Sequence, residues 1–236
     1  MKAKLISVFI TALLLQGTAS FSFAQNVKDN KQSKITEVQE DTPSNRLPVA
    51  IFLKSTAEVF VLLAQGADVN YNNGAAIFML AQVPDLDQNI IDWVLDEKQK
   101  PDVNVHDKKY NTPLHFAAAL GITSSLKGLI KAKAKVNALN YEKRTPLHIT
   151  AFGVNGTADY NSADALIAAG AKVTLKDKYG MTPRDIAIRE NTNPKLVNFL
   201  KQKEEEAAQK ANRKSTEEQK KIKELAQSLK DKKEKF

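Results

Sequence analysis

Apolar and polar positions divide the chain into four parts. The first 24 residues are mostly apolar, and residues 25–45 are polar. Between residues 46 and 200, apolar residues recur at the spacing of short helices that alternate with polar loops. Leu126, for example, lies on one helical face with Leu129 and Ile130. Residues 201–236 are highly charged and contain few apolar residues. We therefore expect one helical domain with an extension at each end.

The first 24 residues have the pattern of a secretory signal peptide. Lys2 and Lys4 precede an apolar run over residues 5–15, and residues 22–24 have the small–x–small spacing that a signal peptidase recognises. We expect cleavage after residue 24, and a second candidate site follows Ala19. A membrane-spanning or buried helix is the alternative, but the apolar run is short for a span.

Residues 25–45 lack aromatic side chains and end in a Pro-Ser-Asn breaker, which predicts a disordered linker. The chain contains no cysteine, so it has no disulfide, thiol nucleophile or thiolate metal site. An exported chain without disulfides is typical of bacteria. We expect a location in the Gram-negative periplasm, with secretion as the alternative.

A four-residue motif recurs at intervals of 33 and 37 residues. Its copies are Thr112-Pro113-Leu114-His115, Thr145-Pro146-Leu147-His148 and Thr182-Pro183-Arg184-Asp185. Eight residues before each threonine stand Asn104, Asn137 and Thr174, each preceded by valine. Two landmarks that recur in one phase indicate an internal repeat.

Each residue of the motif has a physical reason to begin a helix. Threonine is a good N-cap because its side-chain oxygen accepts a hydrogen bond from the helix start. Proline suits the first helical position, where an N–H group has no partner. Leu114 and Leu147 are expected to point to the core, and Ala117 and Ala118 let the next helix approach closely.

The motif and its spacing resemble the ankyrin repeat, whose signature is T-P-L-H-x-A. TPLHFAA at residues 112–118 matches that signature fully. The resemblance implies an all-α repeat solenoid, a stack of helix-turn-helix units with β-hairpin loops, followed by a charged C-terminal helix. About five units would occupy residues 46–200, with atypical first and last caps. It also implies that His115 and His148 form structural hydrogen bonds between repeats.

Two predicted hairpins depart from the family pattern. The glycine that is expected two residues before each threonine is present only as Gly180, and Tyr110 and Lys143 hold the other positions. A non-glycine residue with positive φ costs about 1 kcal/mol. We therefore expect the backbone of these two hairpins to be reshaped.

The sequence does not support catalysis, metal binding or a cofactor. No carboxylate or further nitrogen ligand recurs in phase with the motif histidines, and His106 is expected in an exposed hairpin. There is no G-x-S-x-G turn and no phosphate-binding glycine loop. Acidic residues interrupt the basic loops, which argues against nucleic-acid binding. We therefore predict a non-enzymatic protein.

The ankyrin resemblance implies that a partner protein contacts the hairpin tips and the concave face. Carried over position by position, the candidate contacts are Lys108, Lys109, Asn111, Ala119, Leu120, Tyr141, Glu142, Arg144, Phe152, Lys178, Tyr179 and Met181. Tyrosine and arginine are frequent interface anchors, which favours Tyr141, Arg144 and Tyr179. This strip is basic as a whole, so the expected partner carries an acidic patch.

Residues 201–236 contain no glycine or proline and are rich in helix formers, so we expect a helix. A short apolar stripe comprises Ile222, Leu225, Ala226 and Leu229. The favoured interpretation is a solvated helix that continues from the last repeat. Docking to a partner or to an anionic membrane surface is the alternative, which the short stripe does not favour.

These features predict a periplasmic interaction module that acts as a scaffold or as an accessory to an envelope enzyme. Some bacterial periplasmic ankyrin proteins are associated with protection against oxidative stress, and the layout of this chain is similar. One alternative is an immunity or inhibitor protein that covers an envelope-targeted toxin. A second alternative is a secreted effector directed at a host.

Overall fold

The structure is a computed structural model that describes residues 42–152 and 159–233. The predicted signal peptide, residues 1–24, and nearly all of the predicted linker lie outside the described residues. Asp41–Phe236 form one compact unit. The described part of this unit contains ten α-helices, one short 3₁₀ helix and no strand.

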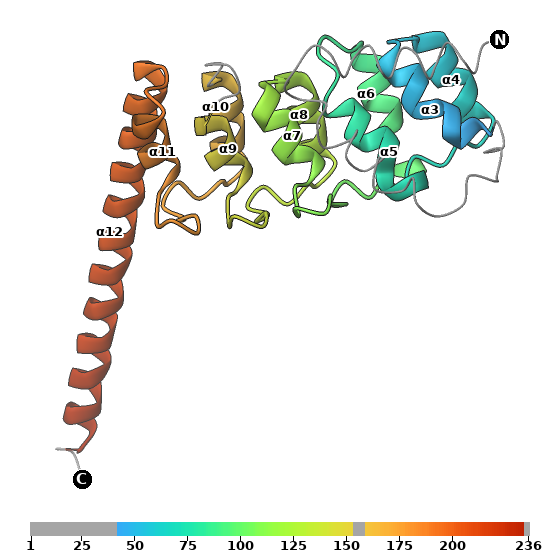
Figure 1. Cartoon of the computed structure of the whole chain (residues 1–236). Helices are drawn as coiled ribbons and strands as arrows, with labels where there is room; N and C mark the ends of the chain where they lie inside the picture. Colours follow the sequence, from blue (N-terminus) through green and yellow to red (C-terminus); the bar gives the residue numbers. More distant parts are fainter. Residues whose placement is uncertain (1–41, 153–158, 234–236) are drawn as a thin grey trace. The chain divides into compact units, whose positions relative to one another are not determined.

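The helices follow one another in pairs (Figure 1). The first helices of the pairs are α3 (Pro43–Phe52), α5 (Tyr71–Leu80), α7 (Pro113–Leu120), α9 (Pro146–Phe152) and α11 (Pro183–Arg189). The second helices are α4 (Thr56–Ala64), α6 (Gln88–Val94), α8 (Thr123–Lys131), α10 (Tyr160–Ala168) and α12 (Pro194–Lys233). The 3₁₀ helix η2 (Glu97–Gln99) follows α6.

Contacts between the pairs define two layers. Each first helix packs on the next first helix, from α3 through α5, α7 and α9 to α11, and each second helix packs on the next second helix, from α4 to α12. Each unit therefore contacts mainly its neighbours, as in a solenoid. This arrangement confirms the predicted helical repeat solenoid, and α3 begins three residues before the predicted domain start.

Buried leucines and small residues form the core between the layers. Leu114 and Leu147 of the repeated motif are fully buried, as predicted. Gly128 of α8 faces α6 so closely that an added Cβ atom would lie 2.5 Å from Cγ2 of Ile91. The absence of a side chain at this position therefore sets how closely the second helices approach.

The connection into α5 lacks the hairpin that the later repeats have. Ile77, Leu80 and Ala81 are buried with the spacing of the core residues of α7. Ile77 follows Asn70 by only seven residues, whereas Leu114 follows Asn104 by ten. The chain turns instead through residues 72–74, whose φ values are 51°, 55° and 73°. These residues are Asn-Asn-Gly, the types that tolerate left-handed backbone best.

The three later connections form similar turns, which we call the tips: residues 107–111, 140–144 and 177–181. The expectation that the tips without glycine are reshaped is wrong. Tyr110 and Lys143 adopt φ values of 61° and 55°, close to the 78° of Gly180. The N–H of each donates to the carbonyl three residues earlier, as in the glycine turn. The tips are turns without assigned strands in the described residues, so strand pairing is not what holds them.

α12 continues well past α11, its partner in the last helix pair (Figure 1). Its first turns pack on α10 and α11, where Leu196 and Leu200 are buried and Glu204 pairs with Arg184 at 3.3 Å. From residue 208 onward, every side chain that the structure describes is exposed. The second helices α4 and α10 are followed within two residues by Gly66 and Gly170, but no glycine follows Leu200, so the helix continues.

Restoring the glycine at a strained tip should stabilise the fold. We expect Lys143→Gly to raise the free energy of unfolding by about 1 kcal/mol, because glycine removes the steric cost of positive φ. Lys109→Gly, at a tip position with ordinary φ, is the control and should lower stability by about 0.5–1 kcal/mol. Urea unfolding of both variants measures these changes. Equal effects of the two substitutions would contradict the strain that we infer.

Candidate protein-interaction site

The two motif histidines link α7 to the tip before α9 and α9 to the tip before α11. Nδ1 of His115 accepts a hydrogen bond from the backbone N–H of Thr112 at 3.1 Å. Its Nε2 must therefore carry the proton, and it donates to the carbonyl oxygen of Arg144 at 3.1 Å. His148 repeats both bonds, with Thr145 at 3.1 Å and with the carbonyl of Met181 at 3.2 Å.

Burial keeps both histidines neutral. His115 is 2% exposed and His148 is fully buried. Burial lowers the pKa of His115 to about 4, and it also lowers the pKa of His148. A proton on Nδ1 would face the N–H of the threonine, so the neutral form is the one that fits the link.

A second link between repeats uses the repeated asparagine that follows a valine. The side-chain oxygens of Asn70, Asn104 and Asn137 accept hydrogen bonds of 2.7–2.8 Å from backbone N–H groups of the following repeat. The donors are Asp102, Lys135 and Lys172. The valine landmark is explained as well, because Val103 and Val173 are buried and Val136 is partly buried against the core.

Neither link continues beyond α11. Thr174 takes the place of asparagine, and Asp185 takes the place of histidine. The carboxylate of Asp185 still accepts hydrogen bonds from the N–H of Thr182 at 2.8 Å and from its hydroxyl at 3.0 Å. It has no second donor with which to reach a further repeat. α11 therefore keeps its cap while the links between repeats end.

The tips are joined to one another through the backbone. The N–H of Tyr141 donates to the carbonyl of Lys109 at 2.8 Å, and the N–H of Lys178 donates to the carbonyl of Glu142 at 2.9 Å. Within each tip the first residue holds the turn, since Asp107, Asn140 or Asp177 accepts two backbone N–H groups with one side-chain oxygen. The three tips therefore form one continuous, rigid strip.

Comparison with known families agrees with this geometry. Residues 77–177 match the family model described as ankyrin repeats in three copies.

Residues 77–177 are ankyrin repeats.

The chain is similar over short stretches to much larger proteins that carry such repeats. It is 33% identical over 101 residues to a homolog of transient receptor potential cation channel subfamily A member 1 from Caenorhabditis elegans, covering 34% of this chain and 8% of that protein. It is 39% identical over 77 residues to potassium channel KOR2 from Oryza sativa subsp. japonica, covering 33% of this chain and 10% of that channel. It is 29% identical over 99 residues to human Rabankyrin-5, covering 42% of this chain and 8% of that protein.

The matched part of this chain spans a tenth or less of each of those relatives. The similarity therefore concerns the repeat and not the whole proteins. Ankyrin repeats are protein–protein interaction modules, and the family is generally a non-enzymatic scaffold. Among the described residues, no group of three or more His, Asp or Glu side chains is arranged to hold a metal ion.

Most of the exposed candidate contact residues lie at the second and third positions of the tips. Lys108 and Lys109 are exposed at the first tip. Tyr141 is 72% exposed at the second tip, and Tyr179 is 61% exposed at the third. The ammonium group of Lys178 lies 5.6 Å from the ring of Tyr141 and 4.9 Å from the ring of Tyr179. A cation thus bridges two exposed aromatic rings on neighbouring ankyrin repeats.

The fifth position of each tip points inward. Asn111 is half-buried and accepts a hydrogen bond from Asn140 at 2.9 Å. Met181 is half-buried, and its carbonyl receives the bond from His148. Beyond the tips, Ala119 and Leu120 are half-buried at the end of α7, and Phe152 is exposed at the end of α9. The guanidinium of Arg144 lies 5.5 Å from the ring of Phe152, so the structure brings the tip positions together and places this helix end beside them.

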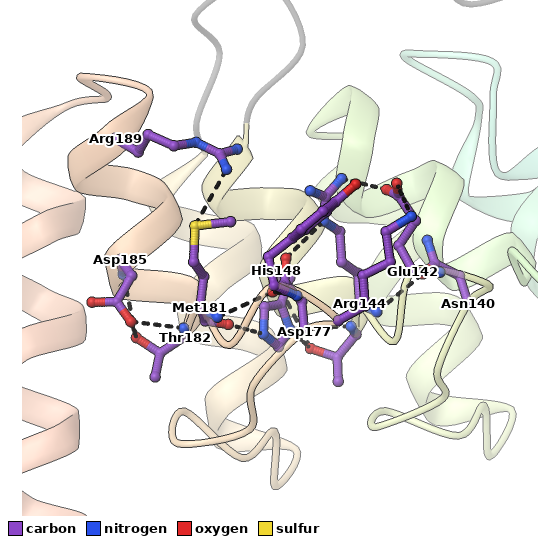
Figure 2. Close-up of polar contacts among 12 residues, drawn as sticks. Asn140, Glu142, Arg144, His148, Asp177, Met181, Thr182, Asp185 and Arg189 are labelled. Carbon is purple, nitrogen blue, oxygen red and sulfur yellow. Dashed lines mark hydrogen bonds and ion pairs between the residues drawn. The ribbon is translucent and has the colours of Figure 1, made fainter.

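Arg144, a predicted interface anchor, lies mostly inside the ankyrin stack. Figure 2 shows its guanidinium between Glu142 and Asp177. Only 12% of its side chain is exposed, and its Nε lies 3.2 Å from the carboxylate of Asp177, which is fully buried. Burial alone would raise the pKa of Asp177, but the backbone N–H groups of Met181 and Tyr179 and the guanidinium of Arg144 lower it. Arg144 thus holds the second and third tips together.

Sequence reasoning missed the residues that shape the tips. Asp107, Asn140 and Asp177 stand at the same position of each tip, always four residues before its last residue. Aspartate and asparagine at such a position are typical of side chains that cap a turn through backbone N–H groups. The repeated asparagine of the second link was visible as a landmark, but its role required the position of the next repeat.

Acid should weaken the links between the ankyrin repeats. The pKa of His115 is about 4 in the folded chain and about 6.5 in an unfolded one, so between these values the unfolded chain binds a proton that the folded chain does not. The stabilising contribution is complete above pH 6.5 and is lost as the pH falls toward 4. We expect a loss on the order of 3 kcal/mol for His115, measured by urea unfolding across this range. His115→Gln should flatten the pH dependence, and an unchanged slope in that variant would contradict the assignment.

Removing the guanidinium of Arg144 should lower the free energy of unfolding far more than removing the exposed ring of Tyr141. Arg144→Ala leaves the buried carboxylate of Asp177 without its cationic partner, so we expect the free energy of unfolding to fall by roughly 2–3 kcal/mol. Tyr141→Ala, an exposed neighbour in the same tip, is the control and should change it by no more than about 0.5 kcal/mol. Thermal and urea unfolding measure both changes. A loss at Arg144 as small as that at Tyr141 would show that the guanidinium is not structural.

Proposed function

We propose that the strip formed by the three tips binds a partner protein that carries an acidic patch. The observation that supports this most is the cluster of Tyr141, Lys178 and Tyr179, in which two exposed rings flank a cation. Tyrosine supplies a large contact area at low entropic cost, which is why it is frequent at the centre of interfaces. A hydrogen bond to Glu142, together with one to Tyr179, raises the pKa of Lys178, so the ammonium stays charged.

The strip is suited to rigid recognition. Its backbone is held by the bonds between tips, and the guanidinium of Arg144 fixes the third tip to the second. Little ordering is therefore needed on binding, and affinity depends on the exposed side chains alone. Lys108 and Lys109 extend the basic surface to the first tip, where they would favour encounter with acidic groups.

The proposed setting is the bacterial periplasm, and the proposed role is that of a scaffold or accessory to an envelope enzyme, with stress protection as the process served. The signal-peptide pattern of residues 1–24 and the lack of cysteine support export. A rigid strip on one edge of the stack suits a protein that holds its partner without covering a catalytic cleft. This role predicts that the bound enzyme keeps its activity.

The first experiment is capture of partners from a bacterial envelope extract with residues 25–236 as bait. Tyr141→Ala combined with Tyr179→Ala should reduce the captured partner at least tenfold while the bait stays folded, because both rings are exposed. The matched control is Leu53→Ala combined with Ile188→Ala, which removes exposed apolar side chains away from the tips and should leave capture unchanged. The amount of captured protein is measured by quantitative mass spectrometry.

Equal capture by the two double variants would contradict the proposed strip. If the captured partner is an enzyme, its activity is assayed with and without the purified chain. Retained activity supports the scaffold role, and abolished activity would replace it with occlusion.

A further inference from the structure

The end of α12 carries two exposed apolar side chains. Ile222 is 67% exposed and Leu225 is 65% exposed. They stand three residues apart, which places them on one face of the helix. α12 is packed against the repeats only in its first turns, so this face is not docked on the last repeat. The sequence favours a solvated helix because the apolar stripe is short, and the structure adds that the stripe lies beyond the packed part of α12.

The positive charge of α12 is concentrated at the same end. Residues 201–218 contain five basic and five acidic residues, whereas residues 219–233 contain six lysines and two acidic residues. The net charge therefore changes from zero to +4 along the helix. Glu224, one of the two acidic residues, lies 3.9 Å from the ammonium of Lys220 on the preceding turn. Exposed apolar side chains and excess positive charge thus occur together.

We propose that the C-terminal end of α12, residues 219–233, binds an anionic lipid surface. A basic amphipathic helix lies in the headgroup region when apolar burial and attraction to acidic lipids act together. Ile222 and Leu225 supply the apolar contact, while Lys221 and Lys223, which flank that face, reach the lipid phosphates. In the described residues no helix is long and apolar enough to cross a membrane. The contact proposed is therefore with the surface of the bilayer.

Two other occupants fit the helix less well. A coiled coil with a second copy requires apolar residues through three or four heptads. Seven residues before Ile222 and Leu225 stand Ser215 and Glu218, so the apolar register is not continued. Two such ends would also repel one another through their lysines. A groove on a protein requires a shaped apolar surface, which two exposed large side chains define poorly, whereas a lipid surface requires only apolar contact and opposite charge.

The length of α12 separates this contact from the tips. The segment from residue 208 to residue 233 extends past the helix pairs, over roughly 40 Å at 1.5 Å per residue. The lipid contact proposed for this segment and the partner contact proposed for the tips therefore use different residues. Lipid binding is thus independent of the proposed partner binding, and each is tested by variants that do not touch the other.

The test is co-sedimentation of residues 41–236, which form one compact unit, with lipid vesicles. We expect binding to vesicles of phosphatidylglycerol and phosphatidylcholine in equal parts, little binding to phosphatidylcholine alone, and weaker binding as salt is raised. Ile222→Gln combined with Leu225→Gln should lower the partition coefficient at least tenfold. Lys221→Gln combined with Lys223→Gln should lower it about fivefold for each charge removed.

The matched control is Leu53→Gln, which removes a similarly exposed apolar side chain from the stack and should leave vesicle binding unchanged. Circular dichroism of each variant establishes that the helices are intact. Three outcomes would overturn the proposal. They are no binding of the unmodified chain to anionic vesicles, equal binding by the Ile222→Gln, Leu225→Gln variant, and a dimer in sedimentation equilibrium that this same variant abolishes.

Discussion

The loops between the helix pairs contain backbone donors and acceptors that no strand satisfies, and the whole arrangement depends on how these groups are paired. Buried or constrained N–H and carbonyl groups need partners, and here many of the partners belong to the neighbouring repeat. His115 reaches the carbonyl of Arg144, and Asn104 reaches the N–H of Lys135. Helix packing brings the repeats together, but these bonds fix their register, because each one is satisfied in a single relative position.

This dependence explains why the proposed interaction surface is rigid although it consists of turns. An isolated turn of five residues would be a poor platform for recognition. Two of the three tips also hold a non-glycine residue at positive φ, which is strained. The side-chain caps and the bonds from tip to tip compensate the strain and remove the freedom of the backbone. What stays exposed is a set of side chains on a fixed frame, so the chemistry of the surface can vary without altering the fold.

The sequence predicted the repeat, the helix starts and the buried leucines, because these follow from local rules of capping and periodicity. It did not predict the absence of a hairpin before α5. The connection from Asn70 to the core residue Ile77 is three residues shorter than the later ones, and this is evident only once Ile77 is known to lie in the core. Nor did it predict the burial of Arg144, since an arginine at a tip can point outward or inward, and the decision depends on Asp177 one repeat away. Tyr110 and Lys143 keep the glycine conformation for a similar reason, because long-range bonds outweigh a local cost of about 1 kcal/mol.

The tips and the C-terminal end of α12 form two different surfaces. The tips gather charge and aromatic rings along one edge of the repeats, and α12 gathers lysines and apolar side chains beyond them. Neither surface uses the residues of the other. The proposed partner binding and the proposed lipid binding can therefore be tested separately, each by a double substitution.

The replacement of histidine and asparagine in the last repeat has a consequence for how copies of the chain meet. His115 and His148 offer the following repeat a protonated Nε2, and the following repeat supplies a carbonyl oxygen. Asn70, Asn104 and Asn137 offer it an amide oxygen, and the following repeat supplies a backbone N–H. Asp185 and Thr174 replace these residues at the C-terminal end of the stack. This end therefore lacks the Nε2 donor and the amide oxygen that could bond to the N-terminal end of another molecule. Head-to-tail joining of identical solenoids, which would propagate without closing into an open filament, therefore lacks the bonds that make the internal junctions specific.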